Sequence, residues 1–281
     1  MKKVAIITDS SAYLPPEIVK ELGLHVVPLT LHWEGESYRD GEDIQAEEFY
    51  ERLAEADTIP TTSQTTVGEF HKLFADLLEK DYAVLAILIS SGISGTVESA
   101  LQAQAEFKDA PIEVIDSQLV SMALGFMVMR VARAANDGAS LAECKALAEE
   151  IYPKIGVYFT VDTLKYLNKG GRINTAKRLM GAALNIKPMM EIREGKIELV
   201  ESVISRKKAM RRMLELVEGD IAGKGKVWIS TFHAAAEEDN RTLMAEAVER
   251  FKPVETVTTF VSPVVGAHTG PGTLSLAYMV E

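Results

Sequence analysis

The chain contains the sequence YAVLAILISSGISGT at residues 82–96. Its first eight residues form an uninterrupted apolar run, which is typical of a parallel strand covered on both faces. The small residues from Ser90 to Gly95 then predict a loop, and a helical pattern follows to about Phe107. A buried strand, a short loop and a helix in this order predict an α/β fold with a mainly parallel sheet.

The same order of elements recurs around this stretch. An apolar run at residues 4–8 predicts another buried strand, and Pro15-Pro16 open a helix because proline suits the first helical turn. Ser140 and Glu143 have the spacing of a capping box for a further helix. The remaining elements expected here are strands at 26–31 and 112–115, helices at 45–56 and from 67, a polar loop at 57–66, and a helix capped by Ser117 that ends at Asp137-Gly138.

The pattern changes near Tyr152-Pro153, and we expect a second domain to begin there. Residues 1–153 are interpreted as an N-terminal α/β domain and residues 154–281 as a smaller C-terminal α+β domain. Glu194-Gly195 between two strand patterns is a hairpin signal. The expected C-terminal elements are strands at 156–161, 187–193, 196–203, 227–232 and 256–261, and helices at 162–168, 206–217 and 237–251.

Composition excludes several classes of function. Of 281 residues, 47 % are hydrophobic and 25 % are charged, which is ordinary for a globular protein with a full core. The net charge of −11 argues against a nucleic-acid-binding protein, which needs a basic surface. Cys144 is the single cysteine, so neither an internal disulfide nor a cysteine metal cluster can form. The sequence predicts no metal site and no cofactor.

Two apolar segments are too short for export or for a membrane span. Asp9 ends the N-terminal apolar run after five residues, short of a signal peptide's core of about 7–15. The apolar stretch at 119–129 is about half as long as a transmembrane helix. We therefore expect a cytoplasmic protein without a membrane span, with transient contact with a membrane surface left open.

Three segments rich in small residues could bind an anion, namely residues 60–66, 90–96 and 266–272. The first two precede predicted helices, where hydroxyl groups, glycine and free N–H groups favour a negative charge. Each alone is also an ordinary turn, but two such loops ahead of consecutive helices favour a site. In the third, His268 stands among glycines, a costly sequence unless the backbone must approach another group closely.

The order of these motifs resembles the DegV family, the fatty-acid-binding subunits of bacterial fatty-acid kinase. The motifs are Thr8-Asp9-Ser10-Ser11, Tyr38-Arg39-Asp40-Gly41, Thr62-Ser63-Gln64, residues 90–96, Lys169-Gly170-Gly171-Arg172-Ile173 and residues 266–272. The resemblance implies a lipid pocket between two domains and no catalysis by this chain. It also implies that Thr62 and Ser94 hold the carboxylate, with His268 and Arg172 close by. The chain departs from the family pattern at Thr65, which is outside the proposed contacts, and at Val97-Glu98, which leave the preferred acyl chain open.

The acyl chain needs an apolar tunnel, for which the candidates are residues 119–129, 179–184 and Met189-Met190. An ionised carboxylate is the nucleophile that would attack the terminal phosphate of ATP. This chain lacks a phosphate-binding glycine motif, so the resemblance implies a separate ATP-dependent kinase subunit, with an acyl phosphate leading to phospholipid synthesis. The cations that could bind this partner are Arg206, Lys207, Lys208 and Arg211.

Two other functions remain open at this point. A serine hydrolase or acyl transferase could use Ser94, between a strand and a helix, with the late His268, although the glycine expected two places after the serine is absent. A binding protein for another small acid or a phosphate could use the same loops. Labelling of Ser94 by a fluorophosphonate would favour the hydrolase, and a co-purifying fatty acid would favour the lipid carrier.

Overall fold

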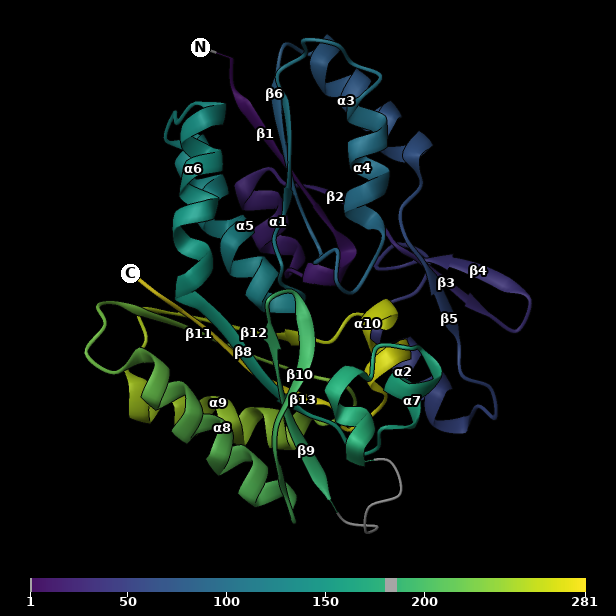
Figure 1. Cartoon of the computed structure of the whole chain (residues 1–281), viewed down its shortest axis with the longest axis vertical. Helices are drawn as coiled ribbons and strands as arrows, with labels where there is room; N and C mark the ends of the chain where they lie inside the picture. The colour runs from purple at the N-terminus through teal and green to yellow at the C-terminus, as the bar shows by residue number, and fades with distance from the viewer. Residues whose placement is uncertain (1, 180–185) are drawn as a thin grey trace.

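The computed structural model describes residues 2–179 and 186–281, and its upper part is a four-stranded parallel sheet (Figure 1). The strand order is β2-β1-β6-β7, and all neighbours run parallel, as the alternating pattern predicted. The strands are β1 (Val4–Asp9), β2 (His25–Val27), β6 (Ala83–Leu88) and β7 (Ile112–Asp116). Both central strands, β1 and β6, are buried along their whole length, so both faces of the sheet are covered.

Helices cover the two faces of this sheet (Figure 1). On one face Phe70 and Phe74 pack with alternate residues of β1 and β6, and the other alternate residues pack with Phe126 and Cys144 on the opposite face. The helices are α1 (Pro16–Leu22), α3 (Val67–Glu79), α4 (Thr96–Gln104), α5 (Ser121–Asn136) and α6 (Leu141–Ile151). The predicted capping box of Ser140 and Glu143 is present at the start of α6.

A small second sheet is present where two sequence predictions are wrong. Residues 26–31 are not one strand, because Pro28 has no N–H group to continue the ladder, and the chain leaves the parallel sheet there. The segment 57–66 is not wholly loop, since it contains a strand that pairs with the chain beyond Pro28. The sheet has the order β4-β3-β5 and consists of β3 (Thr30–Trp33), β4 (Glu36–Arg39) and β5 (Thr61–Ser63), with α2 (Ala46–Glu55) between the last two strands.

The lower part of the molecule is a six-stranded mixed sheet (Figure 1). Its order is β10-β9-β8-β13-β11-β12, and only β11 and β12 run parallel. The strands are β8 (Ile155–Thr160), β9 (Lys187–Arg193), β10 (Lys196–Val203), β11 (Val227–His233), β12 (Glu255–Phe260) and β13 (Leu274–Val280). The predicted hairpin at Glu194-Gly195 joins β9 to β10, whereas β13, which sequence reasoning missed, lies in the centre.

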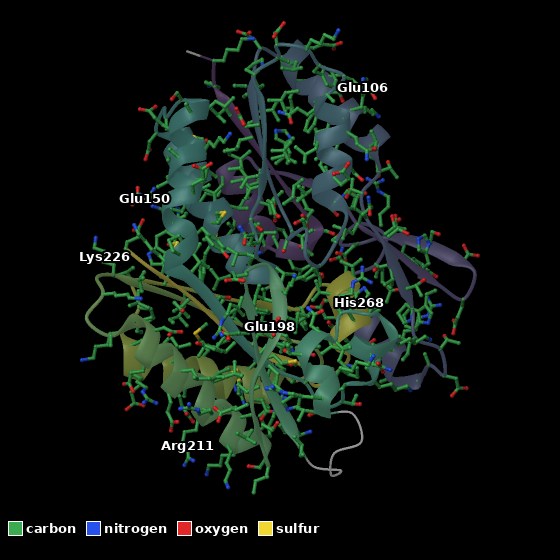
Figure 2. All side chains as sticks on the ribbon, viewed as in Figure 1. Glu106, Glu150, Glu198, Arg211, Lys226 and His268 are labelled. Atoms are coloured by element: carbon green, nitrogen blue, oxygen red, sulfur yellow. The ribbon has the colours of Figure 1, made fainter. Side chains whose placement is uncertain are left out.

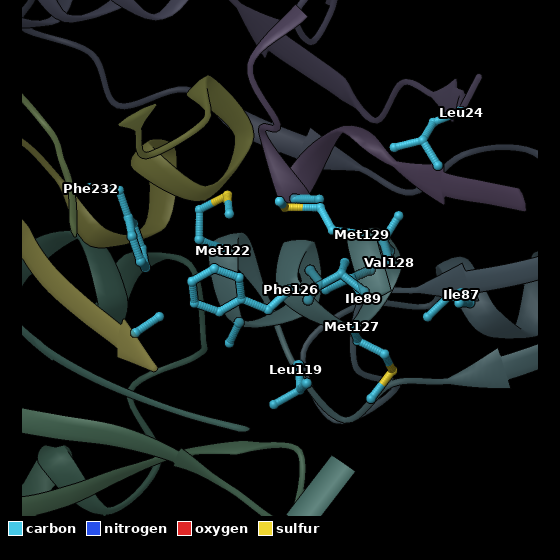
Figure 3. Packing of buried hydrophobic residues seen from close by; sticks show 14 of the residues in the cluster. Leu24, Ile87, Ile89, Leu119, Met122, Phe126, Met127, Val128, Met129 and Phe232 are labelled. Atoms are coloured by element: carbon cyan, nitrogen blue, oxygen red, sulfur yellow. The ribbon is translucent and has the colours of Figure 1, made fainter. Parts of the chain in front are cut away.

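The two faces of the six-stranded sheet have different neighbours. Helices α8 (Arg206–Ile221) and α9 (Glu237–Phe251) cover one face with a core that includes Met213 and Leu276. The opposite face turns toward α5, where the ring of Phe126 meets Trp228 of β11 edge-on, with centroids 6.1 Å apart. Figure 3 shows Met122 and Phe126 of α5 on the side that faces Phe232 of β11. Alternate residues of a strand thus serve two cores.

Three local predictions are wrong for identifiable reasons. Ser117 does not cap α5, because its hydroxyl accepts a hydrogen bond from Leu119 N–H and the helix starts at Ser121. Residues 266–272 are not all loop, because Ser262 caps α10 (Pro263–Thr269) and the left-handed Gly270 ends it. The short helix expected at 162–168 begins later, as α7 (Lys165–Lys169).

Among the described residues, no helix has both the length and the apolar character that crossing a bilayer requires. The longest helices, α5 and α8, have 16 residues each, and α8 carries a row of charged side chains. Each of them packs against a sheet of the protein.

Candidate functional site

A cavity of about 340 Å³ lies between the parallel sheet and the six-stranded sheet. This volume falls in the range of small-molecule sites, roughly 300–1,000 Å³. Apolar side chains form most of its wall, and they come from both halves of the chain: Leu29, Ile89, Ile93, Val120, Val157, Phe159, Ile192, Ile197, Phe232, Val261, Val264 and Val265. Such a cavity suits a largely apolar ligand.

All four residues predicted to hold a carboxylate line this one cavity: Thr62, Ser94, Arg172 and His268. Thr62 and His268, which are 206 positions apart, are joined by a hydrogen bond of 2.7 Å between Oγ1 and Nε2. Figure 2 labels His268 on α10, at the level where the upper and lower parts of the molecule meet. The cavity therefore has one polar end that is built from four separate segments.

The environment of His268 determines which atom donates in its hydrogen bond with Thr62. Burial, and secondarily the positive charge of Arg172, lowers the pKa of His268 to about 4, so the imidazole is neutral at pH 7. Its Nδ1 is buried and has no hydrogen-bond partner among the described residues. Because an orphaned N–H is rarer than an orphaned acceptor, the proton belongs on Nε2, which donates to Thr62. The hydroxyl hydrogen of Thr62 is then free for a ligand.

Arg172 supplies the positive charge, since the neutral His268 does not. Its Nε donates to the carbonyl of Ile93 at 3.1 Å and its Nη1 to the carbonyl of Gly170 at 2.6 Å. A guanidinium has five N–H donors, and these two bonds fix its plane while leaving the other donors for a ligand. The donors at this end are thus Thr62 and Arg172, with Ser94 on the same cavity wall.

Ser94 lies in the loop between β6 and α4, and this loop is held from two sides. At its start, the buried carboxylate of Asp9 accepts from Ile89 N–H at 2.6 Å. From the other side, Ser90 Oγ donates to the carbonyl of Gly195 in the β9–β10 turn at 2.7 Å. The hydroxyl of Ser94 shares a 2.9 Å hydrogen bond with that of Thr96 at the first turn of α4. A ligand anion there would also face the N-terminus of this helix.

Sequence reasoning missed two residues that support the polar end. Gln64 Nε2 donates to Ser99 Oγ at 2.7 Å, and its side chain lies against Gly95, where a Cβ would come within 2.0 Å of Oε1. Gly170 leaves room for the imidazole of His268, because a Cβ at this position would lie 2.0 Å from Nδ1. In the sequence, Gly170 and the glycine after it indicate only a helix end, and no local signal reports such contacts.

The tunnel candidates are only partly placed on the cavity. Of residues 119–129, Val120 and Ser121 line it. Met189 instead packs in the core beneath α8 and Met190 in a separate cluster with Phe159, so neither lines the cavity. In the candidate segment 179–184, positions 180–184 fall outside the described residues.

The two departures from the family pattern lie away from the polar end. Thr65 is buried, and its hydroxyl donates to the carbonyl of Pro28 at 2.9 Å. Val97 packs in the core between the parallel sheet and its helices. Neither Thr65 nor Val97-Glu98 belongs to the cavity wall that the described residues form.

The hydrogen bonds do not assemble a hydrolase. The hydroxyl of Ser94 is bonded to Thr96, and the imidazole of His268 is bonded to Thr62. In a serine hydrolase the histidine would contact the nucleophile and be oriented by an acid on its other nitrogen. Within residues 2–179 and 186–281, Nδ1 of His268 has no such partner.

Comparisons with known proteins agree on one family. The model of the DegV family, described as uncharacterised proteins, matches residues 3–281. A DegV domain-containing protein of Listeria innocua is 35 % identical over 100 % of this chain and 99 % of its own length. The protein DegV of Bacillus subtilis is 32 % identical over 98 % of both chains.

Solved structures give the same result. A DegV family protein from Thermus thermophilus, described as binding fatty acid, superposes with a TM-score of 0.94 at 31 % identity, over 99 % of this chain and 100 % of that one. DegV of Bacillus subtilis, described as a fatty-acid-binding protein, superposes with a TM-score of 0.91 at 32 % identity, over 100 % of both chains.

Proposed function

The chain belongs to the DegV family, and on that premise we propose that it binds one long-chain fatty acid in the cavity between its two large sheets. The carboxylate lies at the polar end, and the acyl chain lies along the apolar wall. The observation that carries this proposal is the convergence of Thr62, Ser94, Arg172 and His268 on one cavity whose wall is mostly apolar.

The physical balance supports tight but reversible binding. About fifteen methylenes at ~0.8 kcal/mol each give a gross driving force of ~12 kcal/mol. Lost translational freedom and ordering of the chain offset a large part of it. A carboxylate left unpaired in this cavity would take up a proton. The hydroxyls of Thr62 and Ser94 and the charge of Arg172 keep it ionised.

We further propose that the bound carboxylate is presented to a separate ATP-dependent kinase subunit. A carboxylate oxygen attacks the terminal phosphorus of ATP, ADP leaves, and an acyl phosphate for phospholipid synthesis remains. This chain acts as the binding subunit and not as the catalyst, because its sequence has no glycine-rich phosphate-binding motif. The neutral His268 fits this role, since it orients the hydroxyl of Thr62 and adds no charge.

The fatty-acid proposal has a direct test. Native mass spectrometry of protein purified from cells is expected to show a bound species of fatty-acid mass. After delipidation, Thr62→Val should weaken palmitate binding about tenfold, because a hydrogen bond to a charged group is lost. Thr61→Val is the matched control, since Thr61 is an exposed residue of the same strand that does not line the cavity. Absence of any lipid, with no palmitate binding by the parent, would refute the proposal.

The first four cations of α8 differ in their availability to a partner. The guanidinium of Arg206 is turned inward, with Nε donating to Asp239 at 2.7 Å. Lys207, Lys208 and Arg211 are exposed, and Figure 2 shows Arg211 at the lower edge of the molecule. Helix α8 covers the face of the sheet opposite the cavity. A kinase that contacts these three cations would be anchored there while it reaches the carboxylate with another surface.

Reversing Lys207, Lys208 and Arg211 to glutamate should slow phosphorylation by the kinase about tenfold at low salt, because a charged rim mainly changes the association rate. Palmitate affinity should not change. The control reverses three lysines that are exposed at the other end of the molecule, namely Lys72, Lys80 and Lys108. Equal kinase rates for the parent and the α8 variant would exclude this surface from docking.

We propose that residues 1–153 and 154–281 are the two domains, because all strands of the parallel sheet precede residue 117 and all strands of the six-stranded sheet follow residue 154. The protein is proposed to act in the cytoplasm, where ATP and a reducing environment fit its single buried cysteine, Cys144.

A further inference from the structure

The cavity wall contains more hydroxyl groups than a carboxylate requires. Beyond Thr62 and Ser94, five others line it, namely Ser63, Ser121, Thr269, Thr273 and Ser275. Ser63 Oγ is hydrogen-bonded to His32 and Thr273 Oγ1 to the carbonyl of Gly270, which leaves Ser121, Thr269 and Ser275. Their exposed fractions are 4 %, 6 % and 1 %, so bulk water hardly reaches them. Oγ1 of Thr269 in particular is fully buried and has no hydrogen-bond partner within the described part of the chain.

The three hydroxyls come from three elements of the cavity wall, α5, α10 and β13, and Thr269 directly follows His268. Ser275 lies on β13, paired with Phe159 of β8 and with Phe232 of β11, and all three line the cavity. Thr269 ends α10, and the hydrogen bond from Thr273 Oγ1 to the carbonyl of Gly270 closes the turn that joins it to β13. Thr269 and Ser275 therefore lie on the wall formed by the six-stranded sheet and the end of α10.

Ser121 adds a second kind of donor to the same space. It is the first residue of α5, a helix of 16 residues whose N-cap, Val120, provides no side-chain hydrogen bond. The first N–H groups of a helix have no partner within it, and here Val120 and Ser121 both line the cavity. The uncapped start of α5 and the unpaired Oγ1 of Thr269 are independent observations that favour a polar atom inside an apolar wall.

A plain hydrocarbon chain offers none of these hydroxyls a partner, and an unpaired buried hydroxyl, such as that of Thr269, costs free energy. An oxygen atom carried along the chain would remove that cost for at least one of them. Resting on the fatty-acid function proposed above, we propose that the preferred ligand is a long-chain fatty acid hydroxylated along its chain, whose hydroxyl bonds with Ser121, Thr269 or Ser275. The carboxylate stays at the polar end, so the added hydroxyl also fixes the depth of the chain in the cavity.

The test compares the affinities of the delipidated protein for stearate and for stearates that carry one hydroxyl at carbon 8, 10, 12 or 14. At least one isomer is expected to bind about five- to tenfold more tightly than stearate, because one net hydrogen bond is gained. In at least one of Ser121→Ala, Thr269→Val and Ser275→Ala, the ratio of the two affinities should fall toward one for that isomer. Ser202→Ala, on the exposed part of β10, is the control and should keep the ratio of the parent.

The possible results distinguish a preference for a hydroxylated chain from fatty-acid binding itself. If stearate binds and no hydroxylated isomer binds more tightly, the present proposal is overturned, while fatty-acid binding stands. A preferred isomer whose advantage survives all three substitutions also overturns it, because the hydroxyl would then bind elsewhere. If neither stearate nor any isomer binds, the fatty-acid function itself is wrong.

Discussion

Gly170→Ala is expected to weaken fatty-acid binding on the order of 100-fold while the protein remains folded. The new Cβ would lie 2.0 Å from Nδ1 of His268, a distance that no packing tolerates. The imidazole is held on its other side by Thr62, so it has to leave that hydrogen bond or displace Gly170, whose carbonyl orients Arg172. Either movement disturbs two of the groups around the carboxylate at once, and about 2.7 kcal/mol corresponds to this loss. Calorimetric titration with palmitate measures it.

A control and a double-mutant cycle identify the cause of that loss. Gly219→Ala in α8 places a methyl group in open space and should leave the palmitate affinity unchanged. In a His268→Ala background the clash partner is gone, so Gly170→Ala should then cost little. If Gly170→Ala costs as much in that background as in the parent, contact with the imidazole is not the reason for the effect.

Asp40→Asn is expected to gain stability relative to the parent as the pH rises from 4 to 8. Burial, with a smaller contribution from the charge of Asp9, raises the pKa of Asp40 to about 7. Hydrogen bonds from Ser10, Val264 and Ser262 favour the ionised form, but they offset the effect of burial only in part. The folded state therefore favours the protonated acid, and ionising this carboxyl above pH 7 costs folding free energy.

The sign follows from proton uptake. Below pH 4 the carboxyl is protonated in both states, and between pH 4 and 7 the folded state binds the proton more tightly. The parent therefore loses stability across this interval. The loss reaches about 4 kcal/mol, because the pKa of Asp40 is raised from 3.8 to about 7. The amide of the variant cannot ionise, so the difference in unfolding free energy between the variant and the parent should grow across the same range.

Urea unfolding at pH 4, 6 and 8 measures this difference. Asp76→Asn is the matched control, because it removes a carboxyl group that is exposed on α3. A difference for Asp40→Asn that is the same at pH 4 and pH 8 would contradict the raised pKa of the buried carboxyl.

Much of the parallel sheet was predictable because local sequence and tertiary role agree there. The apolar run at 82–89 and the hydroxyl-rich loop after it report burial on two faces and a turn into a helix, and β6 and α4 follow. The strand predicted at 26–31 is interrupted at Pro28, where a backbone property outweighs the apolar pattern. The glycines at 266–272 predict a loop, but capping by Ser262 and packing against α2 and α7 make residues 266–269 helical.

The polar end of the cavity could not be derived from spacing. Thr62 and His268 meet although 206 positions separate them, and only the family resemblance placed them together. The supporting contacts were harder still to predict. The carboxylate of Asp9, at the end of β1, accepts a hydrogen bond from Ile89 N–H, just after the neighbouring strand β6. Gly170 leaves room for the imidazole of His268 on α10. Such relations depend on how distant segments pack, which the sequence of any one segment does not contain.

The place of β13 has a consequence for biosynthesis. Residues 274–280 follow every other strand of the six-stranded sheet in the sequence and so leave the ribosome after them, yet they form the strand between β8 and β11. The parallel sheet of the first half can form while translation continues. The mixed sheet has to wait until these residues emerge, because β8 and β11 have no direct pairing until β13 enters between them. A ribosome that stops a few codons before β13 would therefore produce a chain with a folded first half and a cavity that lacks the part of its wall formed by β13.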